Sequence, residues 1–324
     1  MDITEAYKKI HDITAAIPIN GEEILGVYIG IKPAMAEANT GIYNADFLRK
    51  MSVVNSICGE LGLKLAVSKY KYVINSPRGI FKEVLRDDPA PGCLIIGIAR
   101  DMEKAVSGVA HYHLKMHHSK YGRSFAELMG YPSCCIDFGD YLANNKGDPD
   151  NFGFKNPAIE VLKRSDKVAW QLNVFSTSSM LSHFPCSYTC KKSIDYMNSL
   201  LGAIKEADLE HGRVVEDNLK QDISVYWSCV DKVMLRGDFI KKDSLFREGE
   251  ARYESIKWPI GSENFYQEVD SEYLDGMKTI WRSMGEGDCI KISKNSVSVF
   301  KGDDEIGLFE KDSQYSPVIV RADA

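Results

Sequence analysis

Two short segments hold four of the eight cysteines of this chain, and they constrain its fold more than any other feature. They read Gly130-Tyr-Pro-Ser-Cys-Cys135 and Ser182-His-Phe-Pro-Cys-Ser-Tyr-Thr-Cys190. Pro185 directly precedes Cys186, and Pro132 lies two residues before Cys134. Proline is tolerated in the first turn of a helix because the N–H that it lacks would be unpaired there. The sequence therefore predicts that both segments begin helices with cysteines in their first turns.

The spacing of these cysteines indicates a common site. Cys186 and Cys190 are four residues apart, so on a helix they would share one face about one turn apart. Cys134 and Cys135 are adjacent and would point about 100 degrees apart on a helix, so one of them could face a metal and the other the core. The N-terminus of a helix favours the thiolate, which is the form that binds soft metals or attacks electrophiles.

Three or four thiolates are the number that an iron–sulfur cluster or a closed zinc site requires. Zinc ribbons usually carry two close pairs spaced by two residues, whereas here one pair is adjacent and the other is spaced by three. We therefore expect an iron–sulfur cluster, of the [4Fe-4S] type, bound by Cys134, Cys135, Cys186 and Cys190, with zinc or a mononuclear iron as alternatives. His183 is the expected catalytic residue, because it precedes Cys186 by three residues and could act as acid, ligand or hydrogen-bond donor. A role in capping a helix or satisfying a buried carbonyl would explain His183 equally well.

These residues support one leading hypothesis and two alternatives. The leading hypothesis is a metal-dependent, iron–sulfur enzyme that acts on a small-molecule substrate by sulfur transfer, lyase or redox chemistry. The first alternative is a structural zinc-binding protein with a binding or scaffold role. The second is a metal-free thiol enzyme with Cys134 or Cys186 as its nucleophile. The identity of the bound metal separates the first two, and for the thiol enzyme alkylation of one cysteine would abolish activity without loss of any metal.

A group of histidines precedes the first cysteine pair, namely His111, His113, His117 and His118. His113 and His117 would share one face of a helix, a spacing that zinc and di-iron proteins use. No glutamate lies within that helical turn, and His113 continues an apolar stripe of the same helix. We therefore favour a polar helix end over a second metal site.

The charge and hydropathy of the chain limit its partners. Its 324 residues include 40 Lys and Arg against 46 Asp and Glu, a net charge of -6, so we do not expect the basic face of a nucleic-acid binder. No apolar run approaches the roughly 18 residues of a membrane-spanning helix, and the first nine residues lack the pattern of a signal peptide. We therefore expect a cytoplasmic location and no membrane partner. In that compartment, eight cysteines favour free thiols or metal ligation over disulfides.

Apolar periodicity predicts a mixed α/β (α+β) fold in three parts. Residues 1–122 alternate helices and strands, residues 123–212 form a helical region that carries the cysteines, and residues 213–324 form an α+β unit with antiparallel strands. Expected helices cover 2–16, 45–61, 101–118 and 272–284, and expected strands cover 25–32, 63–74, 93–98, 223–230 and 232–236, with a meander in 289–309. Ser124 and Glu127 have the spacing of a capping box that would start a short helix.

The segment Phe125-Ala-Glu-Leu-Met-Gly-Tyr-Pro-Ser-Cys-Cys-Ile-Asp-Phe138 resembles a signature, Leu-Gly-Tyr-Pro-x-Cys-Cys-x-x-x-Phe, of a prokaryotic and largely archaeal family, domain-of-unknown-function family 483. The segments 94–105 and 182–190 are similar to that family as well, so the resemblance covers about residues 90 to 200. Phe138 comes one position earlier than in the signature. The resemblance names no reaction, but it implies that Cys134, Cys135, His183, Cys186 and Cys190 act together.

Overall fold

The computed structural model describes residues 1–41, 45–74, 81–86, 88, 92–117, 122–145, 155–176, 178–226, 232–242, 248–257, 271–310 and 318–322. The chain forms two compact units. The first, unit 1, comprises residues 1–152, 182–186 and 191–213, and the second, unit 2, comprises residues 153–181, 187–190 and 214–324. The expected boundaries at residues 122 and 212 stay a prediction.

Unit 1 is built around a five-stranded sheet whose central strand is β5 (Gly92–Ala99). This strand is the continuous apolar run Cys93-Leu-Ile-Ile-Gly-Ile98, and nearly all of its residues are buried, as expected for a strand covered on both faces. Strand β1 (Ala34–Gly41) pairs with one edge of β5, while β2 (Lys64–Val67) and β3 (Tyr70–Ile74) pair with the other, and β4 (Phe81–Leu85) pairs with β3. Every one of these pairings is antiparallel, and the expected strand over 63–74 is in fact two strands.

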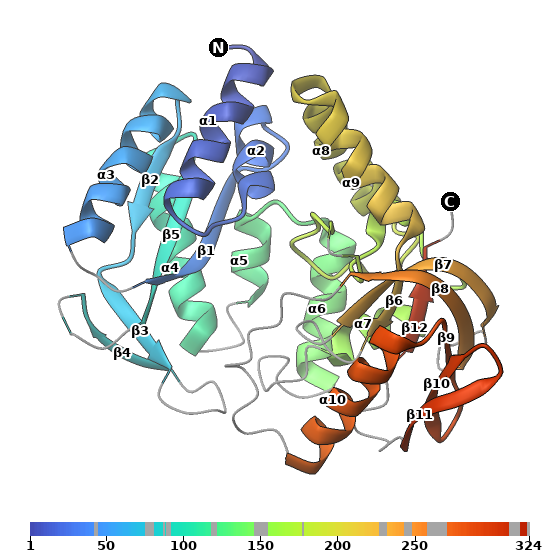
Figure 1. Ribbon diagram of the computed structural model, residues 1–324. Coiled ribbons are helices and arrows are strands. Elements are labelled where there is room, and N and C mark those ends of the chain that lie inside the picture. Colours follow the sequence, from blue (N-terminus) through green and yellow to red (C-terminus); the bar gives the residue numbers. More distant parts are fainter. Residues whose placement is uncertain are drawn as a thin grey trace. The chain divides into compact units, whose positions relative to one another are not determined.

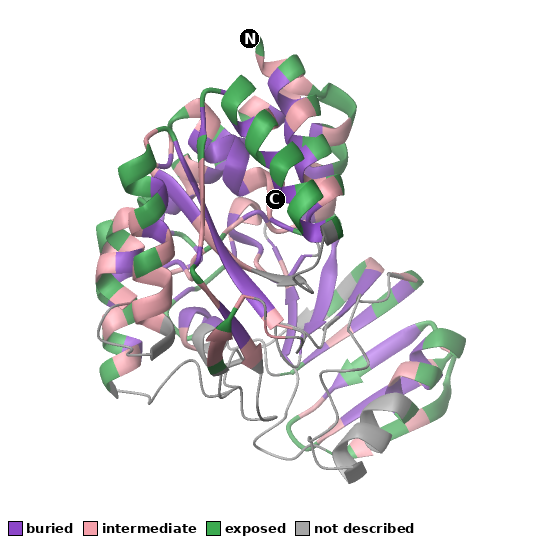
Figure 2. Ribbon diagram, turned by 90° about the vertical axis from the view of Figure 1, so that its left-hand side faces the viewer, coloured by how far each residue is buried: buried purple, intermediate pink, exposed green. Residues whose placement is uncertain are grey.

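Helices cover this sheet (Figure 1). Helix α4 (Met102–His117) packs on β5, β1 and β2, and α1 (Ile3–Ala16) packs against α2 (Gly21–Ile29), α3 (Ala45–Glu60) and α8 (Lys191–Ala207). The short α5 (Gly122–Leu128) contacts both α4 and α6 (Ser133–Asn145). Buried and exposed residues alternate along these helices, which is the pattern of amphipathic helices on a sheet (Figure 2).

Two expectations in unit 1 are wrong. The segment predicted as a strand over 25–32 forms the end of α2, because Asn20 caps this helix by accepting a hydrogen bond from the backbone N–H of Glu23 (3.0 Å). Glycine at position 30, in the left-handed region (φ 84°), then ends it. Ser124 does not cap α5, which begins two residues earlier; its hydroxyl hydrogen-bonds His111 Nδ1 instead (3.0 Å).

Unit 2 contains a seven-stranded antiparallel sheet in the order β11-β10-β9-β8-β7-β6-β12. Its strands are β6 (Ile223–Tyr226), β7 (Lys232–Lys242), β8 (Gly249–Lys257), β9 (Cys289–Ile292), β10 (Ser296–Lys301), β11 (Asp304–Glu310) and β12 (Val318–Arg321). Helix α10 (Ser271–Glu286) packs on β10 and β11 and closes an apolar core that includes Ile280 and Met284. The expected meander over 289–309 is confirmed as β9, β10 and β11.

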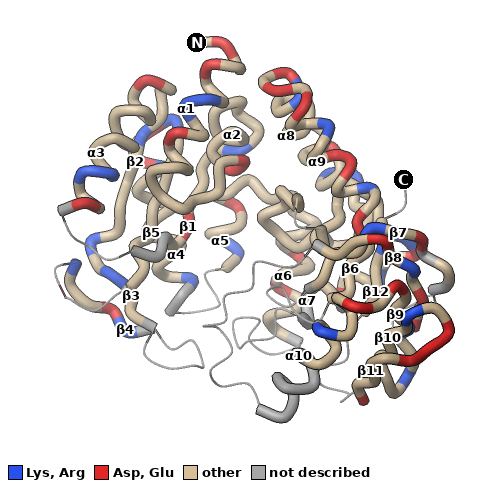
Figure 3. The backbone as a smooth tube through the Cα atoms, in the orientation of Figure 1, with Lys and Arg blue, Asp and Glu red and all other residues tan. Residues whose placement is uncertain are grey.

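Three further elements lie in the described part of the chain: α7 (Lys155–Leu162), the 3₁₀ turn η2 (Trp170–Leu172) and α9 (Leu209–Gln221). The mixed α+β class is confirmed. Acidic and basic side chains are interspersed along the helices and strands of each unit (Figure 3). Among the described residues, no helix has the length and apolar character needed to span a membrane.

Candidate metal centre

Cys134 and Cys135 lie in the first turn of α6, as the sequence predicts. The carbonyl of Pro132 accepts hydrogen bonds from the backbone N–H groups of Cys135 (2.8 Å) and Ile136 (3.0 Å), so the helix begins directly after this proline. The Sγ atoms of Cys134 and Cys135 are 4.0 Å apart. Both sulfurs belong to one group of potential ligand atoms, so of the two possibilities that the sequence leaves open, three thiolates or four, the structure brings four together.

The segment from Ser182 to Cys190 is not the start of a helix, which corrects the sequence-based expectation. Helix α8 begins at Lys191, and Cys190 closes a turn in which its N–H donates to the Ser187 carbonyl (3.1 Å). Tyr188 explains the irregular path: its N–H donates to Ser165 Oγ (2.7 Å) and its carbonyl accepts from the N–H of residue 169 (3.0 Å). Because these backbone groups are satisfied by other segments, they do not need a helix.

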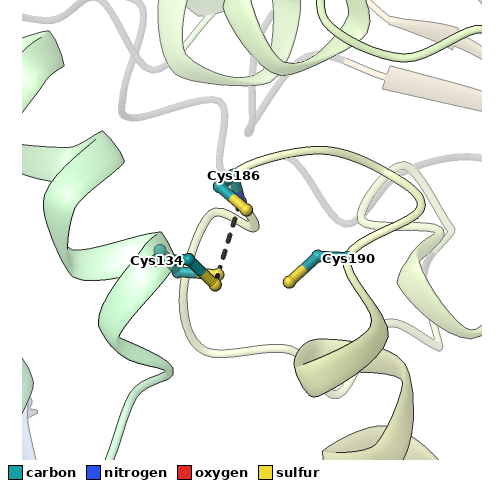
Figure 4. A group of neighbouring side chains, drawn as sticks. Cys134, Cys186 and Cys190 are labelled. Atoms are coloured by element: carbon teal, nitrogen blue, oxygen red, sulfur yellow. Dashed lines mark hydrogen bonds between the residues drawn. The ribbon is translucent and has the colours of Figure 1, made fainter.

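The sulfurs of the two segments nevertheless converge. Cys134, Cys135, Cys186 and Cys190, called the cysteine cluster below, have Sγ atoms that all lie within 4.8 Å of one another (Figure 4). Cys135 and Cys190 are buried, whereas Cys134 and Cys186 are half-buried. A group of four cysteine sulfurs at this spacing can bind a metal.

Cys135 receives further polar contacts. The backbone N–H of Cys186 donates to Cys135 Sγ (3.4 Å), and Ser193 Oγ lies 3.4 Å from the same sulfur. Ser193 is fully buried in the first turn of α8. Hydrogen bonds to a sulfur stabilise its thiolate form, so these contacts suit a metal ligand.

His183 reaches the cysteine cluster only through Ser193. Its Nε2 lies 3.0 Å from Ser193 Oγ, and it does not belong to the group of ligand atoms that could hold a metal. Its Nδ1 is buried and has no hydrogen-bond partner among the residues that the structure describes. Burial, and then the charge of Lys32, lower the pKa of His183 well below its usual value, so the ring is neutral near pH 7.

A buried ion pair close to His183 was not predicted from the sequence. Lys32 Nζ pairs with Glu23 and also donates to Ser182 Oγ (3.3 Å), and only 1% of the Lys32 side chain is exposed. Tyr131 joins this group, because its hydroxyl donates to the Ser182 carbonyl (3.1 Å) and its ring lies under Lys32 Nζ, 5.1 Å from the ring centroid. Burial lowers the pKa of Lys32, and Glu23 opposes that shift.

The Tyr131 ring is 4.8 Å from that of His183, measured between centroids. Tyr131 and Ser182 belong to the two cysteine segments, so their motifs could have indicated them. No local sequence pattern identifies Glu23 or Lys32 as part of the site. Each is a charged residue at the end of an apolar segment.

The histidines of α4 do not form a metal site within the described part of the chain. His111 hydrogen-bonds to Ser124, while His113 Nδ1 hydrogen-bonds to the Tyr72 hydroxyl and lies 3.8 Å from Glu83. The two side chains thus have separate partners. The side chain of His117 and the whole of His118 lie outside the described residues.

Comparisons of this chain with models of protein families, with curated proteins and with solved structures found no match. The resemblance to domain-of-unknown-function family 483 therefore stays a prediction, and the cysteine cluster is the feature of the molecule that indicates a function.

Proposed function

We propose that this protein is a metalloprotein in which the cysteine cluster binds one metal ion, zinc, as four thiolate ligands. The observation that carries the proposal is the close spacing of the four sulfurs. Metal binding would tie the start of α6 to the segment that leads into α8, and its main role would be structural. This is the alternative of a zinc-binding protein, rather than the iron–sulfur enzyme that the cysteine spacing favoured.

The spacing supports a single ion for a geometric reason. Zinc binds cysteine sulfur at about 2.3 Å, so sulfurs at the corners of a regular tetrahedron are about 3.8 Å apart, and two ligands of one ion cannot exceed about 4.6 Å. The 4.0 Å between the sulfurs of Cys134 and Cys135 agrees with the tetrahedral value, and the bound of 4.8 Å for all four sulfurs is slightly above the limit. A slight inward movement would complete such a site.

A cubane cluster places greater demands on the cysteines. In a [4Fe-4S] cluster each cysteine binds a different iron. The distance between two cysteine sulfurs therefore includes the separation of two irons and the two Fe–S(Cys) bonds, which point away from the cluster. Four sulfurs around such a cluster must therefore stand farther apart than four sulfurs around one ion. The cysteine cluster would have to open before it could accept one. Tetrahedral sulfur coordination by four ligands is typical of zinc structural sites.

The enzyme remains a second candidate because of two observations. Cys134 and Cys186 are half-buried, so a substrate could reach that side of the cysteine cluster. His183 also contacts Ser193, which contacts Cys135, and could supply or accept a proton close to the sulfurs. In this second candidate the cysteine cluster binds an iron–sulfur cluster, His183 is the catalytic residue and the substrate is a small molecule.

Purification without oxygen, followed by assays of zinc, iron and sulfide, separates the candidates. We expect one zinc per chain, no sulfide and no colour in the wild type, and loss of the zinc in Cys186→Ala. Cys93→Ala is the matched control, because Cys93 is a lone buried cysteine in β5 and should leave the metal content unchanged. A brown protein that contains iron and sulfide would refute the zinc site and support the iron–sulfur enzyme. Absence of any metal would refute both and leave thiol chemistry.

A further inference from the structure

We propose that Ser193 is a positioning residue for the metal site, which orders the Cys135 thiolate on one side and fixes the tautomer of His183 on the other. This inference depends on the proposed metal site and adds a residue to it. The three side chains concerned are called the relay below. All three belong to unit 1, and their contacts are Cys135 Sγ to Ser193 Oγ at 3.4 Å and Ser193 Oγ to His183 Nε2 at 3.0 Å.

The direction of the hydrogen bonds in the relay follows from the charge of the sulfur. A thiolate that binds a metal has no proton and can only accept, so the Ser193 hydroxyl must donate to Cys135 Sγ. The serine has a single proton, and its oxygen can then only accept from His183. Nε2 of His183 must therefore carry the ring proton, which leaves Nδ1 as the unprotonated nitrogen of a neutral ring.

The surroundings of His183 agree with this assignment. Nδ1 is buried and has no hydrogen-bond partner among the described residues, and a nitrogen without a proton tolerates that position better than an N–H group would. The nearby charge of Lys32 also opposes protonation of the ring. The aromatic rings of Tyr131 and Tyr196 lie 4.8 Å and 6.2 Å from the His183 ring, measured between centroids, and hold it in place.

Ser193 is placed so that its hydroxyl can orient the Cys135 sulfur. It is fully buried in the first turn of α8, three residues after Cys190. Its hydroxyl therefore connects a ligand from the start of α6 to the helix that follows the second pair of cysteines. Groups that hydrogen-bond a metal ligand orient it, and loss of such a group typically weakens metal binding by about 10- to 100-fold.

The test compares metal binding by the wild type, Ser193→Ala and Ser199→Ala. Ser199 lies on the same helix, but its hydroxyl bonds to the Asp195 carbonyl (2.9 Å), so it serves as the matched control. Cobalt is titrated into the metal-free proteins in competition with a chelator, and the thiolate-to-cobalt charge-transfer band is recorded. We expect Ser193→Ala to bind cobalt about 10- to 100-fold more weakly with a shifted band, and Ser199→Ala to match the wild type.

The outcomes are distinguishable. Equal affinity and equal spectra for all three proteins would overturn the role of Ser193 and leave the metal site intact. A wild type that binds no cobalt would overturn the metal site, and the relay with it. Should Ser193→Ala fail to fold, the tautomer of His183 decides the matter in the wild type: ¹⁵N chemical shifts of the zinc-loaded protein should show a protonated Nε2. A protonated Nδ1 with a bare Nε2 would refute the relay.

Discussion

The buried pair of Lys32 and Glu23 allows a quantitative prediction about the stability of unit 1. The two side chains are 1% and 8% exposed, so neither charge is solvated when its partner is removed. Removal of one partner of a buried pair typically costs about 3–5 kcal/mol, because the other charge is left uncompensated. Lys32→Met also loses the contacts of Nζ with Ser182 and with the Tyr131 ring. We therefore expect Lys32→Met to reduce the free energy of unfolding of unit 1 by about 3–5 kcal/mol.

The assay must report on unit 1 alone. The four tryptophans are at positions 170, 227, 258 and 281, all of which belong to unit 2, so tryptophan fluorescence follows that unit. Amide hydrogen exchange of β5, the buried central strand, reports on the opening of unit 1 instead. A loss of about 3 kcal/mol corresponds to exchange that is faster by roughly a hundredfold or more.

The matched control is the double variant Lys32→Met/Glu23→Leu, which replaces the pair by apolar side chains. Replacement of a whole buried pair is often neutral or stabilising, so we expect slower exchange in the double variant than in either single variant. Two results would refute the reasoning: a cost below about 1 kcal/mol for Lys32→Met, or single-variant effects that simply add in the double variant.

Two further predictions concern pH and glycine. The pKa of His183 is lowered in the folded state, so the unfolded chain binds more protons, and folding is favoured above the unfolded value near 6.5 and weakened as the pH falls below it. The difference in unfolding free energy between wild type and His183→Gln should therefore shrink from pH 7 to pH 5. NMR titration should show that the His183 ring stays neutral at pH 5, and a titration midpoint near the usual 6.5 would contradict this prediction. A Cβ at Gly97 would lie 2.3 Å from the carbonyl oxygen of Ala105, whereas a Cβ at Gly59, in α3, would meet nothing within 4 Å. Thermal unfolding should thus show Gly97→Ala strongly destabilised and Gly59→Ala stabilised by about 0.5–1 kcal/mol; the reverse order would be inconsistent with the packing of α4 on β5.

The sequence was sufficient where one strong local signal determined the structure. Pro132 and the apolar residues after it predicted α6, and the apolar run through Cys93 predicted the central strand β5. The apolar residues of segment 25–32 suit a strand as well as a buried helix, and the cap by Asn20 favours the helix that the structure contains. Short apolar runs cannot be resolved by periodicity alone.

For the site, the sequence identified which cysteines come together but not how they do so. Cys186 and Cys190 were expected one helical turn apart, yet Tyr188 is held by hydrogen bonds to Ser165 and residue 169, and the segment between the two cysteines follows a turn. These partners are distant in sequence, so no local pattern could reveal them. The same holds for Ser193, whose importance depends on contacts with Cys135 and His183.

The unequal burial of the four sulfurs has a consequence for how a bound metal would leave. Cys135 and Cys190 are buried, while Cys134 and Cys186 are half-buried, so an incoming reagent would reach the latter two thiolates first. A chelator could replace the two accessible thiolates one after the other while the two enclosed ones still hold the ion. Exchange would then proceed through a mixed complex, and its rate would rise with the concentration of the chelator. Metal retention would accordingly depend on access to Cys134 and Cys186 as much as on affinity.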